Sequence, residues 1–413
     1  MSVPADTFDV LPERRGTNCY KWDRRPRNST GRPLLPMWVA DMDFACPPAV
    51  REALAARIAH PVYGYTFEPA DHRRAFCDWQ RERNGWRIEE EWLVQAPAVM
   101  PAVRAAILAF TEPGDEVVIQ TPVYYPFFDA VRDNGRELVL NPLIEERHAD
   151  ASSPYGAHYS MDLDHLESVI GPRTRMLLLC SPHNPVGRVW SRRELGALAE
   201  LCLRHDLTVV SDEIHCDLRR ARASFTPFAD LGPEVAARTV ACHSASKTFN
   251  VAGIAAAHVV VPAAEVRARF SSTLGRLGMT LANILAMEAS HAAYASSADW
   301  LDALTGYLDS QIAWLACELD RRFGSDRTVT ISPIEGTYLA WLDLRAILRG
   351  TGTTHCEAER ALLEEAALWL SDGRQFGDNG EGFFRMNLAT SRSLVCDGLS
   401  RLEEAIRFLE RSG

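Results

Sequence analysis

Apolar residues between positions 90 and 262 fall into short runs separated by longer segments with helical spacing. The runs cover residues 117–119, 176–180, 207–210, 239–243 and 256–261. Between the second and third runs, Ser191-Arg192-Arg193-Glu194 has the sequence of a capping box that opens a helix, with apolar residues on one face at 195, 198 and 202. The alternation is typical of βαβ units and predicts an α/β fold with a mainly parallel sheet between helices.

After residue 262 the pattern changes to long helical stretches. A strand-like segment follows at 337–342, and a last helix carries apolar residues at 395, 399, 402, 406 and 409. This change predicts a second, smaller α+β domain. No repeat and no Gly/Ser linker separates the parts, so we expect them to pack together. We expect an N-terminal arm at 1–45, a large domain at 46–290 and a small domain at 291–413.

Composition limits the classes of function. The chain has 413 residues, 47% of them hydrophobic, and a formal net charge of −11. Acidic charge without basic clusters argues against nucleic-acid and anionic-membrane partners. No apolar run reaches the roughly 18 to 20 residues that span a bilayer, and the first residues do not resemble a signal peptide, so we expect a cytoplasmic protein. The ten cysteines include no C-x-x-C pair, which predicts reduced thiols and no metal site.

Lysine is nearly absent from this chain. Of 44 basic residues, only Lys21 and Lys247 are lysines, and the others are arginines. Arginine cannot lose its proton to become a nucleophilic amine, so chemistry that needs a free amine must use one of these two positions. Lys21 lies in Tyr20-Lys21-Trp22 without neighbouring catalytic groups, and we interpret it as structural.

Two of the predicted strands are followed by groups that can react or carry charge. Ser244-Ala245-Ser246-Lys247 places an amine beside two hydroxyls that can donate to a phosphate, although a lysine at a strand end is often just a surface group. Ser211-Asp212-Glu213-Ile214-His215 follows another run. Asp212 can keep a pyridine nitrogen protonated or simply cap a helix, and His215 can bond a phenolic oxygen or fill the core.

Two further segments follow strands in the same way. In Ser181-Pro182-His183-Asn184-Pro185-Val186-Gly187, two prolines and a glycine force a turn that can present the Asn184 amide inward. Thr121-Pro122-Val123-Tyr124-Tyr125 places an aromatic face where a ring can stack, although aromatic residues there are often ordinary core. Because open α/β sheets bind ligands at the carboxyl ends of their strands, all four segments are expected to meet in one site.

In combination and order, these segments resemble the fold-type I pyridoxal 5′-phosphate (PLP) enzymes, the aspartate-aminotransferase superfamily. The resemblance covers nearly the whole chain. Within it, six segments are similar to the MalY/PatB-type cystathionine β-lyases, namely Pro36 to Phe44, Tyr63-Gly64-Tyr65, 181–187, Asp212-Glu213-Ile214-His215, 244–250 and 336–345. The resemblance implies a mainly parallel seven-stranded sheet in the large domain, a PLP cofactor, and a homodimer with active sites at the subunit interface.

The resemblance also implies roles for individual residues. Lys247 would hold PLP as an imine and later move the α-proton, and Asp212 would pair with the ring nitrogen. Arg385 would clamp the substrate carboxylate, beside Ala40 and Asn184. The remaining cofactor contacts would be ring stacking by Tyr124, hydrogen bonds from Asn184 and His215 to the phenolic oxygen, and phosphate contacts from Ser244, Ser246, the amides of Val99 and Met100, and Tyr65 of a second subunit.

Some positions depart from the pattern of the superfamily. An arginine that often holds the phosphate is replaced by Ala255, and the glycine often found before the phosphate-binding helix is missing from Ala96-Pro97-Ala98. Relatives often carry Pro-Gly where this chain has Asp372-Gly373, followed by Arg374. These departures affect the phosphate contacts and the shape of the substrate mouth.

The function that we expect is a carbon-sulfur β-lyase for cystathionine or another S-substituted L-cysteine, with a thiol, pyruvate and ammonia as products. An aminotransferase shares the early steps, and so does an oxidative deaminase or decarboxylase of a specialised biosynthetic pathway. A regulatory binding protein on the same scaffold is a further alternative, although a protein that only binds has no need of a reactive lysine beside a carboxylate.

Overall fold

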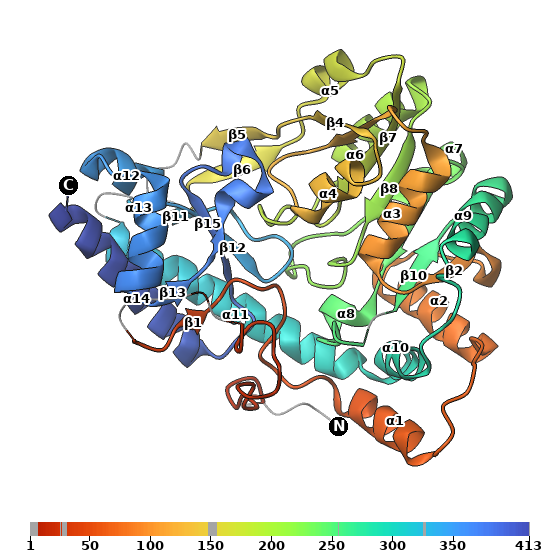
Figure 1. The fold of residues 1–413 in the computed structure, drawn as a ribbon, viewed down its shortest axis with the longest axis horizontal. Helices are drawn as coiled ribbons and strands as arrows, with labels where there is room; N and C mark the ends of the chain where they lie inside the picture. Colours follow the sequence, from red (N-terminus) through yellow and green to blue (C-terminus); the bar gives the residue numbers. More distant parts are fainter. Residues whose placement is uncertain are drawn as a thin grey trace.

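The computed structural model describes residues 7–24, 26, 31–147, 155–254, 256–324 and 328–412. Two lobes lie side by side, one built around a seven-stranded sheet and the other around a four-stranded sheet (Figure 1). This arrangement agrees with the predicted α/β fold that carries a second, smaller α+β part. The predicted boundaries at 45/46 and 290/291 remain a proposal.

The large sheet is mainly parallel, as predicted. Its strand β10 is antiparallel to both neighbours, whereas the other pairings are parallel. The order across the sheet is β2 (Leu93–Ala96), β10 (Ala257–Val260), β9 (Thr239–His243), β8 (Thr208–Asp212), β7 (Thr174–Cys180), β3 (Glu116–Ile119) and β4 (Glu137–Leu140).

Helices cover both faces of this sheet because successive side chains of each strand point to opposite sides. Val117 and Ile119 of β3 pack in the core beneath one set of helices, whereas Val118 between them packs in the core on the other side. The first face carries α3 (Val99–Phe110), α4 (Pro126–Arg132) and α9 (Ala264–Arg276). The second face carries α2 (Ala70–Asn84), α5 (Leu163–Val169), α6 (Arg192–Arg204), α7 (Pro233–Ala236) and α10 (Ile284–Ser296), with α1 (Pro48–Ala59) packed on α10.

The capping box predicted at the start of α6 is present. Ser191 accepts a hydrogen bond from the Glu194 amide, and the Glu194 side chain accepts one from the Ser191 amide. The short helix α8 (Ala245–Thr248) follows β9 and carries Lys247.

The small lobe is an antiparallel sheet with helices packed on it. Its strands, in order, are β11 (Thr330–Ile331), β12 (Leu339–Asp343), β15 (Phe383–Asn387) and β14 (Ser371–Asp372). Its helices are α12 (Arg345–Thr351), α13 (His355–Arg360) and α14 (Arg392–Ser412). Two further strand pairs join β1 (Leu35–Pro36) to β13 (Leu368–Trp369) and β5 (Ile144–Arg147) to β6 (Ala157–Ser160).

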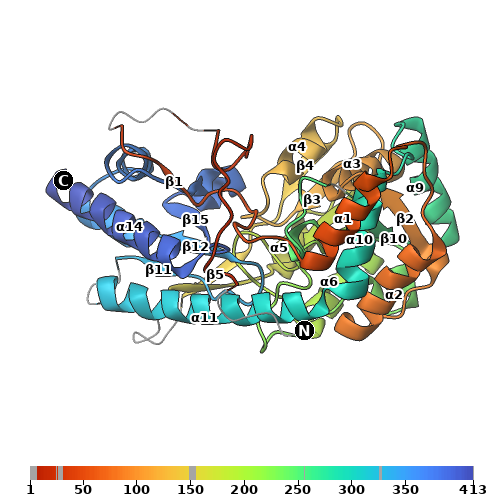
Figure 2. The ribbon, with the colours of Figure 1, turned by 90° about the horizontal axis from the view of Figure 1, so that it is seen from below.

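One long helix and the N-terminal segment tie the lobes together. Helix α11 (Ala298–Phe323) runs from one lobe to the other (Figure 2). Its first half packs in the core that includes α2 and α10, and its second half packs in the core of the small lobe. The N-terminal segment follows a similar course, because Phe8 packs against Trp300 while Leu35 pairs with Leu368.

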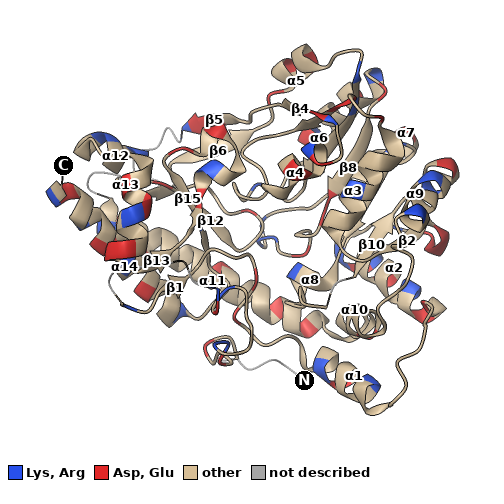
Figure 3. Cartoon of the chain, viewed as in Figure 1, with Lys and Arg blue, Asp and Glu red and all other residues tan. Residues whose placement is uncertain are grey.

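Charged residues of both signs are interspersed over the helices and loops (Figure 3). Among the residues that the structure describes, no helix has the length and apolar character needed to cross a bilayer.

Candidate active site

A cavity of about 330 Å³ opens at the carboxyl ends of the central strands. Its wall contains Lys247, Asp212, His215, Asn184 and Arg385. Other residues that were predicted from the sequence also line it, namely Tyr124, Val99, Met100, Ser246 and Ala40. The structure therefore brings residues from distant parts of the sequence to one place.

Lys247 is the only lysine in the wall of this cavity. Its Nζ donates a hydrogen bond to the Ala40 carbonyl at 2.5 Å. Burial lowers the pKa of Lys247 to about 8, with Asp41 opposing and Arg385 assisting the shift. The amine can thus lose its proton near neutral pH. The other lysine, Lys21, is buried elsewhere and pairs with Asp43 at 2.8 Å.

Asp212 ends strand β8 and points its carboxylate into the same cavity. The backbone amide of Ile214 donates to its Oδ1 at 3.1 Å. Burial is the largest effect on this group and raises its pKa to about 6. A cation placed beside this carboxylate would restore its charge, because an opposite charge favours the ionised form.

His215 lies three residues further on and is buried. Burial, followed by repulsion from Lys247 and Arg385, lowers its pKa to about 3, so its ring is neutral. Within the described part of the chain, its Nδ1 has no hydrogen-bond partner. A buried ring nitrogen of this kind is available to a ligand in the cavity.

Arg385 and Asn184 meet across the two lobes. Strand β15 carries Arg385, and the turn after β7 carries Asn184, whose Oδ1 accepts a hydrogen bond from Arg385 Nη1 at 2.9 Å. The other terminal nitrogen, Nη2, donates to the Trp38 carbonyl at 2.8 Å and to Ser371 Oγ at 3.2 Å. The guanidinium is thereby fixed in a plane, as recognition of a carboxylate requires.

Groups that can hold an anion lie near Lys247. Val99 and Met100 are the first residues of α3, where backbone amides have no partner within the helix. Ser246 lines the cavity with them. Ser244 lies just behind, where its hydroxyl bonds the Ala256 carbonyl at 2.6 Å and Ser246 Oγ at 2.7 Å. Ala255 lies outside the described residues.

Tyr65 does not reach the cavity of its own chain. It is 94% exposed, in an extended segment that also exposes Val62 and Phe67. Its position in the site of a second subunit stays a prediction.

Near the mouth, Arg374 is held by its neighbours rather than turned into the cavity. It pairs with Asp372 at 2.7 Å and with Glu359 at 2.9 Å. Its pKa is raised, most strongly by the hydrogen bond with Asp372. The next residue, Gln375, lines the cavity instead.

Comparison with known proteins assigns the family. The sequence model of the aminotransferase class I and II family matches residues 34–402. The chain belongs to this family. It is 40% identical to cystathionine beta-lyase PatB of Bacillus subtilis, over 97% of this chain and 99% of that protein. It is 33% identical to protein MalY of Escherichia coli, over 97% and 98%.

The family fold is also found in solved structures. Cystalysin from Treponema denticola, which contains a pyridoxal 5′-phosphate cofactor, superimposes with a TM-score of 0.88 at 32% identity and covers 97% of this chain and 99% of its own. The structure therefore has the fold-type I architecture that the sequence predicted.

Several residues in the wall of the cavity or next to it were not predicted from the sequence. The Tyr338 hydroxyl donates to the Ala40 carbonyl at 2.9 Å, beside Lys247. Tyr20, Trp38, Tyr125 and Gln375 form part of the wall near Arg385. Trp38, Tyr125 and Tyr338 lie within the segments 36–44, 121–125 and 336–345, but their residue types are common in ordinary cores, so nothing in those segments distinguishes them as site residues.

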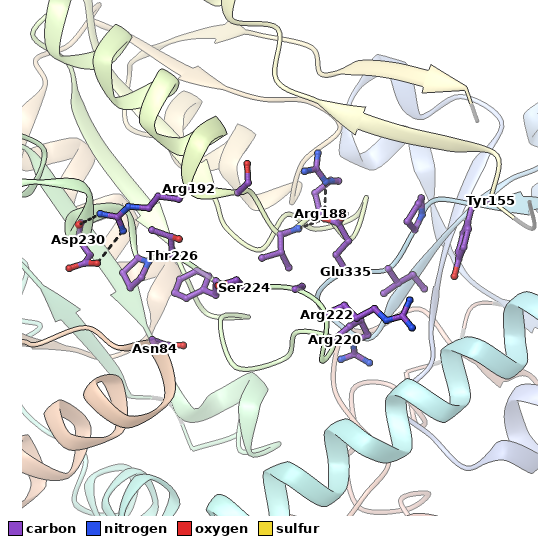
Figure 4. Close-up of a pocket in the computed structure, with 17 residues that line it drawn as sticks. Asn84, Tyr155, Arg188, Arg192, Arg220, Arg222, Ser224, Thr226, Asp230 and Glu335 are labelled. Atoms are coloured by element: carbon purple, nitrogen blue, oxygen red, sulfur yellow. Dashed lines mark hydrogen bonds and ion pairs between the residues drawn. The ribbon is translucent and has the colours of Figure 1, made fainter. Parts of the chain in front are cut away.

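A second, larger cavity of about 760 Å³ lies between 188–192, 220–227 and 333–335 (Figure 4). Its wall contains no lysine, and much of its charge is paired internally. Arg188 pairs with Glu335 at 2.8 Å and Arg192 with Asp230 at 3.4 Å. The reactive groups described above line the smaller cavity, which is the candidate active site.

Proposed function

We propose that the protein is a PLP-dependent carbon-sulfur β-lyase that acts on cystathionine or another S-substituted L-cysteine. The observation that carries this proposal is a lysine amine in one cavity with a buried carboxylate and a fixed arginine fork. It is supported by the similarity to PatB, a cystathionine beta-lyase, and to cystalysin, which contains pyridoxal 5′-phosphate.

The residues of the cavity fit PLP. Asp212 suits the ring nitrogen, because a cation there offsets the cost of a buried charge. Asn184 and the unpartnered His215 suit the phenolic oxygen, and Tyr124 suits the ring face. Val99, Met100, Ser244 and Ser246 suit the phosphate. When bound, PLP supplies an electron sink that makes bonds at the α-carbon of an amino acid easier to break.

The chain itself supplies binding and proton transfer. Arg385 binds the substrate α-carboxylate through two parallel hydrogen bonds, and this orients the α-carbon towards Lys247. The Lys247 amine, whose pKa burial lowers to about 8, takes the α-proton as a general base in its uncharged form. The carbon-sulfur bond then breaks, and the thiolate leaves with the electron pair. The released aminoacrylate adds water to give pyruvate and ammonia.

The test is product analysis without a keto acid. Purified enzyme is incubated with cystathionine or an S-alkyl cysteine, and pyruvate and free thiol are measured together. Equal amounts of both are expected. A strict requirement for a keto-acid acceptor would instead identify an aminotransferase, which the family also contains.

The role of Lys247 is tested separately. Lys247→Ala should abolish turnover, and the matched change Lys21→Arg, at the other lysine, should leave it largely intact. In borohydride-treated wild type, the mass of the cofactor should be found on the peptide that contains Lys247. Turnover retained in Lys247→Ala contradicts the proposal.

We propose further that the enzyme is a homodimer that takes up Tyr65 from the second subunit. The exposure of Tyr65, Val62 and Phe67 in one segment supports this, because such residues are usually covered in an assembly. Light scattering should give the mass of a dimer, and Tyr65→Phe should weaken PLP retention. A cytoplasmic location is supported by ten cysteines that are all free.

A further inference from the structure

Two histidines from different helices lie together outside the candidate active site. His72 is in the first turn of α2, and His291 is in the middle of α10. Their rings stack with centroids 4.1 Å apart and planes inclined by 17°. Asp71, beside His72, completes a group in which one ligand atom of each residue lies within 4.8 Å of the others.

The histidines are available as ligands. His72 is only 8% exposed, and its Nδ1 has no hydrogen-bond partner within the described part of the chain. An imidazole nitrogen without a hydrogen-bond partner can offer its lone pair to a metal ion. A buried nitrogen without a partner costs free energy, which a bound cation would recover.

Negative charge is gathered at the same place. Asp71 is exposed at the start of α2. Glu288 lies three residues before His291 on α10, so these two residues share one face of that helix. Both carboxylates act electrostatically on His72, so negative charge is present where a cation would bind.

We propose that His72, His291 and Asp71 form a binding site for Zn²⁺ that links α2 to α10. Two imidazoles with one or two carboxylates are ligands that Zn²⁺ favours, whereas Mg²⁺ and Ca²⁺ prefer oxygen ligands alone. No motif in the sequence points to this site, because its histidines lie in separate helices, far apart in the chain.

The cluster must contract to bind the ion. Ligand atoms around tetrahedral Zn²⁺ lie about 3.3 Å apart, which follows from metal-ligand distances of roughly 2.0 to 2.1 Å. Stacked rings also point their lone pairs in parallel, so one ring must turn towards the other. His291 is half-buried and Asp71 is exposed, and these two side chains have room to turn while His72 stays in place. Asp71 also leaves an entry path from solvent.

The position of the site gives it a structural consequence. Helix α2 begins at Ala70, directly after the extended segment that exposes Tyr65 and Phe67. Zinc bound by Asp71 and His72 would fix the start of α2 against α10. It would thus hold the point from which this segment leaves the lobe.

The site can be tested by equilibrium dialysis of the PLP-loaded enzyme, after removal of metals with a chelator. With ZnCl₂ at micromolar free concentration, wild type should bind one zinc per chain, and MgCl₂ should not bind there. His291→Ala should weaken zinc binding by more than about 100-fold, because even loss of a group behind a metal ligand costs roughly 10- to 100-fold. Asp71→Asn, an exposed change, should also weaken it.

The matched control is His205→Ala, which removes a surface histidine that pairs with Glu167. This variant should bind zinc as wild type does, which separates the site from zinc held weakly by other surface histidines. Zinc should also raise the unfolding temperature of wild type and leave that of His291→Ala unchanged. The proposal is overturned if wild type does not bind zinc. It is also overturned if His291→Ala and Asp71→Asn bind zinc as tightly as wild type does.

Discussion

Asp212 is expected to destabilise the protein without cofactor and to stabilise it with cofactor. Without a cation beside it, the buried carboxyl has a pKa of about 6 instead of its ordinary 3.8, because burial disfavours the charge. The folded state then binds more protons than the unfolded state between these values. Stability contributed by this group is therefore full below pH 3.8 and is lost as the pH rises through 6.

The size of the effect follows from the shift. About 2.2 pKa units at 1.36 kcal/mol each make the ionised carboxylate cost roughly 3 kcal/mol above pH 7. Asp212→Asn removes this charge and keeps the oxygen that accepts from the Ile214 amide. With an unfolding entropy of about 2.1 cal/mol/K per residue over 413 residues, 3 kcal/mol corresponds to about 3 °C.

The assay compares unfolding temperatures of wild type and Asp212→Asn at pH 5 and pH 8. Without PLP, the variant should be about 3 °C more stable at pH 8, and the difference should shrink at pH 5. With PLP, the order should reverse, because the ring nitrogen then pairs with the carboxylate only in wild type. Activity should fall at least 100-fold. A cofactor-free variant that is less stable than wild type at pH 8 would refute the reasoning.

Three further substitutions test other parts of the structure. Arg385→Lys should lower kcat/KM for the amino-acid substrate roughly 10- to 100-fold, since charged hydrogen bonds of about 1.5 to 3 kcal/mol are lost; an unchanged kcat/KM would contradict its role. Lys21→Ala should cost about 3 kcal/mol in denaturant unfolding, because it leaves Arg14 as the remaining cation at the buried Asp43, beside the Trp22 indole; a neutral result would mean that these partners suffice. Ser191→Ala should cost about 1 kcal/mol in the same assay and leave kcat unchanged, and a loss of kcat would show that this cap also shapes the site.

The central strands were predictable because burial on both faces makes them continuously apolar. The predicted run 239–243 coincides with β9, whose residues are all buried, and 176–180 lies within β7. The edge strands β2 and β4 were not among the predicted runs. Strand β4 is half exposed and β2 is buried only at its ends, so neither has a strong apolar pattern. The antiparallel direction of β10 is a property of chain topology that local sequence does not encode.

The sequence predicts the place of a site residue only where that residue stands at the end of a predicted strand. Lys247, Asp212 and Asn184 follow strands of one sheet, so their meeting follows from the rule for open α/β sheets. The contact between Lys247 and the Ala40 carbonyl joins residues 207 positions apart and depends on the path of the N-terminal segment. That path is set by packing of Phe8 and Leu35, which no local motif reveals.

The cofactor groups and the substrate groups of the site depend on different parts of the fold. Lys247, Asp212 and His215 all follow strands of the large sheet, so their spacing is fixed within one lobe. Arg385 belongs to the small lobe, and its three hydrogen bonds reach Asn184, Ser371 and the Trp38 carbonyl, which come from three separate segments. Ser371 and Trp38 move together with Arg385, because β14 pairs with β15 and Met37 is hydrogen-bonded to Trp369 and Asn387. A shift of the small lobe by one ångström would therefore break the bond between Arg385 and Asn184 while leaving the cofactor groups in place, because hydrogen bonds weaken steeply beyond their normal length. Changes in the packing of the lobes should therefore alter the binding of substrate before they alter the retention of PLP.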